Sequence, residues 1–177
     1  GIAALLLPGT AIWTSPPEKG LVLRRDFAET RPGQTGALMR AIWRAGPWLD
    51  EPDHRGTAAE IVSRAEYLDL PSELVERGLT GRLLVSPAGE ARAVPRLLAF
   101  NAGAASFPWK SLAALIARNI ALRHDLPPEG AMQRAMGHFR TDLYRRHLRP
   151  AGASLPGASL RLEGMIGEDR TVAAERG

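Results

Sequence analysis

The stretch Trp13-Thr-Ser-Pro-Pro-Glu-Lys-Gly-Leu-Val-Leu-Arg-Arg-Asp-Phe27 carries the most informative local pattern in the chain. Two consecutive prolines restrict the backbone before Glu18 and Lys19, because proline fixes φ and lacks an N–H donor. Gly20 lets the backbone pass close to a neighbour or a ligand, and the apolar run Leu21–Leu23 predicts a short strand. A lysine on this entry can meet an anion as a compact point charge. A solvated lysine on an ordinary loop explains the same spacing.

The composition is that of a soluble globular protein. A length of 177 residues suffices for one domain with a sizeable core. The absence of cysteine excludes a disulfide framework and a thiolate nucleophile. A formal charge of +4 suits an anionic partner, although the excess of arginine over lysine can equally reflect genome composition.

The apolar run Ile2–Leu7 is too short to cross a bilayer of about 30 Å, so we expect no transmembrane segment in this chain. It also lacks the basic flank and cleavage site of a signal peptide. We interpret it as a buried strand stopped by Pro8-Gly9. Because the chain starts directly on this strand, we expect the natural N-terminus to lie well upstream.

Helical patterns follow, and we expect the helices to pack on a sheet. Apolar residues at spacings of three and four indicate one stripe on a helix that ends near Asp50. The stripe consists of Leu38, Ala41, Ile42, Ala45 and Trp48. Further buried strands are predicted at Leu97–Phe100 and Leu160–Leu162. We divide the chain into an α/β part over residues 1–150 and an irregular tail, rich in Gly, Ala, Ser and Pro, over residues 151–177.

Motifs of catalysis and metal binding are missing from the sequence. It contains no phosphate-binding loop, dinucleotide fingerprint, His-Glu-x-x-His or nucleophile elbow. Glu18 beside Lys19 could form an acid/base pair, yet neighbours on a strand point to opposite faces. His138 and His147 could meet in space, but solvated or capping histidines are the commoner case. We therefore expect a protein that is not an enzyme and needs no metal or cofactor.

A basic run surrounds Tyr144, formed by Arg140, Arg145, Arg146, His147 and Arg149. Such a run with a stacking aromatic superficially suits nucleic-acid binding. On a helix these arginines spread over more than one face, and Asp142 lies among them. A solvated face is the favoured interpretation, and no direct nucleic-acid partner is expected.

Several blocks, taken in order, resemble the C-terminal half of the nitrate/bicarbonate-binding family of ABC-transporter solute-binding proteins. They are Pro17-Glu18-Lys19-Gly20-Leu21 with Arg25-Asp26-Phe27-Ala28, Ala41-Ile42-x-x-Ala45-x-x-Trp48-Leu49-Asp50, Tyr67-Leu68 with Leu79-Thr80-Gly81, Phe100 with Ala105-Ser106-Phe107-Pro108-Trp109-Lys110-Ser111, Phe139-Arg140-x-Asp142-Leu143-Tyr144, and Leu155-Pro156-Gly157-Ala158-Ser159 with Glu163-Gly164. No single block is unique to the family, but their order is specific. The segment from Leu112 to His124 departs from the family pattern by lacking its usual aromatics.

The resemblance implies an α/β, type-II periplasmic-binding-protein-like fold, present here as the C-terminal portion of a two-lobe protein that holds its ligand in an interlobe cleft. Among the family's anion contacts, the lysine of the Pro-Glu-Lys motif corresponds to Lys19, with Glu18 and Trp13 as secondary candidates. Bicarbonate-binding relatives carry an acidic residue at that position. Lys19 therefore favours nitrate or nitrite as the ligand.

Three functional alternatives remain open on this resemblance. A solute-binding component would deliver the anion to an ABC permease and lie in the periplasm or at the membrane. A cytosolic nitrate sensor of the same family would instead release a regulatory protein partner, an RNA-binding antiterminator. A truncated paralogue would bind nothing.

Overall fold

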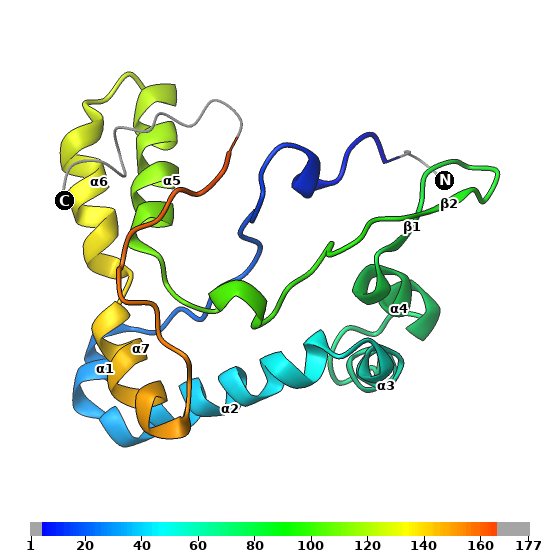
Figure 1. The fold of residues 1–177 in the computed structure, drawn as a ribbon, viewed down its shortest axis with the longest axis horizontal. Coiled ribbons are helices and arrows are strands. Elements are labelled where there is room, and N and C mark those ends of the chain that lie inside the picture. The colour runs from blue at the N-terminus through cyan, green and yellow to red at the C-terminus, as the bar shows by residue number, and fades with distance from the viewer. Residues whose placement is uncertain (1–4, 166–177) are drawn as a thin grey trace. The chain divides into compact units, whose positions relative to one another are not determined.

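The computed structural model describes residues 5–165 and is mainly helical (Figure 1). The helices are α1 (Arg25–Thr30), α2 (Pro32–Asp50), α3 (Arg55–Val62), α4 (Ser72–Thr80), α5 (Lys110–Arg123), α6 (Pro128–His138) and α7 (Thr141–Leu148). The strands assigned within the described range are β1 (Arg82–Leu84) and β2 (Ala91–Ala93). No helix in that range is long and apolar enough to cross a membrane.

The chain divides into two compact units. The first unit contains the chain up to Ile12 and Arg44–Ala105, and the second contains Trp13–Trp43 and the chain from Ser106 onward. Helix α2 begins in the second unit and ends in the first. From the sequence we instead place a boundary between residues 150 and 151, where we expect an irregular tail to begin. That boundary stays a prediction.

In the first unit, α3 packs against α4, and a hairpin of β1 and β2 follows. Gly81 ends α4 in the left-handed conformation, with φ of 72°, and a Cβ there would lie 2.5 Å from the carbonyl oxygen of Val94. Glycine is therefore required at this helix end. Arg82 pairs with Ala93 in antiparallel register, and Gly89, with a positive φ of 88°, lies in the turn between the strands.

The C-terminus of α2 holds the segment at residues 100–102 in the first unit. The Asp50 carboxylate accepts backbone N–H groups from Phe100 and Asn101, both at 2.8 Å, and from Ala102 at 2.7 Å. The predicted strand Leu97–Phe100 is wrong, because these residues are irregular, with bends at Leu97 and Phe100. The N–H of Phe100 bonds to a side chain rather than to a neighbouring strand.

The second unit contains α1, the first part of α2, and α5, α6 and α7, and α5 and α6 pack side by side (Figure 1). Its buried apolar residues include Phe107, Trp109, Leu115, Leu143, Tyr144 and Leu148. The Phe107 ring meets Trp109 and Tyr144 edge-on, with centroids 4.9 and 5.2 Å apart. Such contacts give this small aromatic cluster a specific geometry.

The other predicted strands are not found in the described range. Leu5–Leu7 and Leu21–Leu23 lie outside strands, and Val22 is 89% exposed; Ile2–Ala4 fall outside the described residues. Leu160–Leu162 is likewise irregular. An extended segment becomes a stable strand only when another strand pairs with its backbone groups, and the described residues supply none here.

Candidate anion-binding site

Lys19 lies on the irregular segment between Trp13 and α1, in the second unit. Its side chain is 88% exposed, and its Nζ lies 3.4 Å from Oε1 of the exposed Glu18. An exposed pair of this kind is weak, so the ammonium can exchange Glu18 for another anion. The predicted close approach at Gly20 is not seen, since a Cβ there would meet no atom within 4 Å.

Trp13 and Thr14 fasten the start of this segment to residues near the end of the described chain. The indole Nε1–H of Trp13 donates to the carbonyl oxygen of Glu163 at 2.9 Å, and the Thr14 N–H donates to that of Gly164 at 3.1 Å. Trp13 also forms an isolated antiparallel bridge with Met165. The indole N–H of Trp13 thus already donates to a backbone carbonyl of this chain, and in this structure Trp13 fastens the segment to residues 163–165.

Gly164 permits this contact by its conformation. Its φ is 72°, and a Cβ would lie 2.7 Å from Oγ1 of Thr14. Any other residue would be strained in its backbone and would also push Thr14 away. The Glu163-Gly164 pair of the sequence pattern therefore has a structural role that sequence analysis did not assign.

The carboxylate of Glu163 is 0% exposed and fully engaged. Ser111 donates its hydroxyl to Oε1 at 2.5 Å, and Arg161 approaches Oε2 with Nε at 3.2 Å. The guanidinium of Arg161 lies over the Trp109 ring, 4.6 Å from its centroid. Ser111 sits in the first turn of α5, where the helix dipole favours a nearby negative charge. We call Glu163, Arg161, Ser111 and Trp109 the Glu163 cluster.

Arg145 on α7 holds the segment that precedes this cluster. It donates to the carbonyl oxygens of Pro156 at 2.5 Å and Ala158 at 3.0 Å, and to the Ser159 hydroxyl at 3.3 Å. Its guanidinium also lies over the Phe107 ring, 4.9 Å from the centroid. The backbone N–H of Lys110 donates to the Ser159 carbonyl oxygen at 2.9 Å. Two blocks of the sequence pattern, the one with Ala105–Ser111 and the one with Leu155–Ser159, thus meet within the second unit.

Tyr144 is not available for stacking. It is 7% exposed, and its hydroxyl lies 2.8 Å from that of Ser106. Burial raises the pKa of the phenol. Its role is in the core of the second unit.

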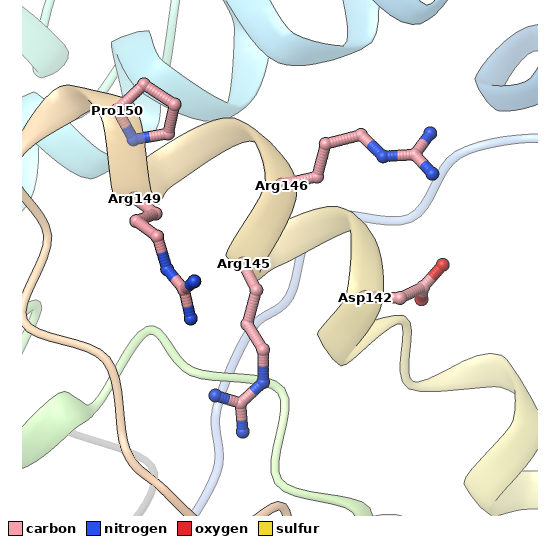
Figure 2. Close-up of a pocket in the computed structure, with 5 residues that line it drawn as sticks. All are labelled: Asp142, Arg145, Arg146, Arg149 and Pro150. Carbon is pink, nitrogen blue, oxygen red and sulfur yellow. The ribbon is translucent and has the colours of Figure 1, made fainter.

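The end of α7 forms a cationic cavity of about 310 Å³ (Figure 2). It is lined by Asp142, Arg145, Arg146, Arg149 and Pro150, and we call it the arginine cavity. Asp142 is paired with Arg140 through two contacts at 2.8 and 2.6 Å, and this hydrogen bonding holds its pKa at about 2. The histidines form no metal site within the described residues, where no three potential ligands gather.

The sequence comparisons agree with the resemblance. A model of the NMT1-like family matches residues 5–63. The bicarbonate-binding protein CmpA of Synechococcus elongatus is 29% identical over 105 residues, covering 57% of this chain and 23% of that protein. The nitrate/nitrite binding protein NrtA of the same organism is 28% identical over 100 residues, covering 56% of this chain and 23% of that protein.

The structural comparison decides the fold. The crystal structure of the periplasmic nitrate-binding protein NrtA from Synechocystis PCC 6803 matches with a TM-score of 0.76 and 22% identity, over 86% of this chain and 41% of that one. The chain is similar in sequence to the bicarbonate-binding protein CmpA and the nitrate/nitrite binding protein NrtA. The predicted type-II periplasmic-binding-protein-like fold is confirmed, as a part of the two-lobe architecture. The chain spans about a quarter of the length of these curated relatives.

The relatives are named as binding proteins, in line with the expectation of binding rather than catalysis. The comparisons do not distinguish bicarbonate from nitrate as the ligand, because the chain is almost equally similar to CmpA and to NrtA. The anion contacts at Lys19, Glu18 and Trp13 stay predictions.

Proposed function

We propose that this chain takes part in binding a small oxyanion, nitrate or nitrite, in the interlobe cleft of a solute-binding protein that serves an ABC transporter. The observation that carries the proposal is the arrangement around Lys19. The segment is fastened at Trp13 and Thr14, yet the lysine ammonium stays exposed. Such an arrangement suits a charge that is held in place for a ligand from outside.

The chemistry of the ligand supports a lysine in this role. Burying a monoanion costs free energy unless a cation and hydrogen-bond donors compensate for the lost water. A lysine ammonium offers three donors and one positive charge. Pro16 and Pro17 restrict the link between the anchor and Lys19, so less conformational freedom is lost when the anion binds.

The relatives support the class of ligand and the place of action. Those named above bind bicarbonate, nitrate or nitrite, and the solved one is named as periplasmic. Within this family resemblance, a lysine at position 19 favours nitrate or nitrite over bicarbonate. The periplasmic relative favours the transport role over a cytosolic sensor.

Calorimetric titration of the full-length protein with nitrate, nitrite and bicarbonate tests the proposal. We expect nitrate or nitrite to bind, and Lys19→Glu to weaken that binding by at least about tenfold, since a charge-assisted contact contributes about 1.5–3 kcal/mol. Lys110→Glu makes the same charge change at the other lysine of the chain and serves as the control. Absence of binding to all three anions by the folded protein would disprove the proposal. Equal losses of anion affinity in both variants would show that Lys19 is not part of the site.

A further inference from the structure

The arginine cavity carries positive charge without a matching negative charge. Arg145, Arg146 and Arg149 line it, and Asp142 is the one carboxylate among its lining residues. Asp142 is already neutralised by Arg140. The guanidinium groups of Arg146 and Arg149 have no hydrogen-bond or ion-pair partner among the residues that the structure describes. The surface therefore presents uncompensated guanidinium groups.

Part of this surface is preorganised. Arg145 is fixed by the carbonyl oxygens of Pro156 and Ala158 and by the face of Phe107. Arg149 lies four residues further along the chain and projects to the same side as Arg145 in Figure 2. Arg146 projects to another side of α7, toward that of Asp142 (Figure 2). A partner would thus meet one guanidinium that is already ordered and two that become ordered on binding, so the cost in side-chain entropy is reduced only at Arg145.

Helix stabilisation explains only part of this pattern. Cations near the C-terminus of a helix interact favourably with its dipole, and Arg145 and Arg146 lie in the last turn of α7. That effect accounts for the sign of the charge. It does not require a cavity lined by three arginines whose single acid is already paired.

The kind of partner follows from the surroundings. A single-stranded nucleic acid needs an exposed aromatic on which bases stack, and Tyr144 is buried with its hydroxyl bonded to Ser106. Arginine binds carboxylates through two parallel hydrogen bonds and is enriched at protein interfaces.

We propose that the arginine cavity is a docking surface for an acidic segment of a partner protein. Carboxylates of that segment would pair with Arg149 and with Arg146, which project to different sides at the end of α7, while Arg145 keeps its contacts with residues 156–159. This surface is separate in sequence from Lys19, and the inference does not depend on anion binding there. Long-range attraction by the arginines would also speed association at low ionic strength.

The test uses fluorescence anisotropy with a labelled, alanine-rich helical peptide that carries glutamates one turn apart. We expect the full protein to bind it in a salt-dependent way and the Arg146→Gln/Arg149→Gln double variant to bind about tenfold more weakly, the loss typical of removing interfacial charge pairs. Arg145 is left unchanged because it holds the segment at residues 156–159. The control, Arg123→Gln/Arg134→Gln, removes the same charge from exposed positions on α5 and α6.

Retained binding in the control supports the proposal. Equal loss in both double variants would overturn it, because attraction would then depend only on net charge. Equal binding of a glutamine version of the peptide would also overturn it. So would preferential binding of a single-stranded oligonucleotide of the same charge, or complete competition by inorganic phosphate at the same ionic strength.

Discussion

At the scale of single residues, Glu163 connects the candidate site to the core of the second unit. Its side chain binds Ser111 and Arg161, while its backbone carbonyl accepts the indole N–H of Trp13. A buried carboxylate is tolerated only when a cation and donors satisfy it. Glu163 therefore holds a buried charge with its side chain and fixes the position of Trp13 with its backbone.

The Glu163→Gln substitution tests this link. Glutamine keeps the shape but leaves Arg161 without its anion, so we expect a loss of about 2 kcal/mol in the free energy of unfolding. Urea denaturation measures it. Glu129→Gln, at an exposed position on α6, should change stability by less than about 0.5 kcal/mol. Similar values for the two variants would show that the buried charge contributes little.

His147 on α7 packs closely against α2 in the second unit. A Cβ at position 36 would lie 2.5 Å from its Nδ1, so Gly36 makes room for the ring. Its Nε2 is buried and has no hydrogen-bond partner in the described part of the chain. Burial, and then the charges of Arg146 and Arg40, lower the pKa of His147 below its ordinary value of 6.5.

This lowered pKa predicts a dependence of stability on pH. The folded state binds the His147 proton more weakly than the unfolded state does, so protonation favours unfolding. The stabilisation is fully present above about pH 6.5 and is lost as the pH falls through the folded-state pKa. Urea melts at about pH 7.5 and about pH 5 should show a smaller decline for His147→Gln than for the natural chain. The exposed His138→Gln should keep the natural decline; an unchanged decline in His147→Gln would exclude this histidine as the cause.

At the scale of elements, α2 shows how a correct helix can be assigned the wrong face. The sequence predicted the helix and its end at Asp50, and both are confirmed. The apolar stripe that includes Leu38, Ile42 and Trp48 is exposed in this structure, while Gly36 and Gly46 are buried. A Cβ at Gly46 would lie 3.1 Å from Cβ of Asn101. Hydrophobic periodicity does not detect a packing face made from glycine, because close backbone approach rather than side-chain area creates it.

The contact at the end of α2 predicts the effect of Asp50→Asn. An asparagine offers one acceptor oxygen in place of two, so at least one of the three N–H groups at Phe100, Asn101 and Ala102 loses its partner. We expect a loss of about 1–2 kcal/mol in stability. Hydrogen exchange should accelerate at these amides and not in α5. The exposed Asp53→Asn is the control, and equal protection in both variants would disprove the role of Asp50.

At the scale of the whole molecule, the ordered blocks of the sequence predicted the fold class, and the structural match confirms it. The local strand predictions at Leu21–Leu23 and Leu97–Phe100 are wrong. Apolar runs report burial or extension, but pairing depends on which segments lie beside them, and a single sequence does not contain that information. Helices were easier to predict because their hydrogen bonds are local.

The candidate site, too, could be predicted only in part from the sequence. Lys19 could be singled out from a compact motif, whereas the Glu163 cluster could not, because its members are separated by about fifty residues and Trp13 by 150. Glu163 is an isolated acid in a Gly- and Ala-rich stretch, and that unusual setting was the available signal. Only the three-dimensional contacts assign it a role.

The contact between Trp13 and Glu163 also constrains the order of folding. It closes a loop of 150 residues, so its entropic cost is met only after more local structure has formed. During synthesis the ribosome releases Trp13 long before Glu163 has been made. The segment that carries Lys19 therefore cannot form its contacts with residues 163–165 until the last part of the described chain has been made. Formation of the proposed anion site would then be a late step in the folding of each new molecule.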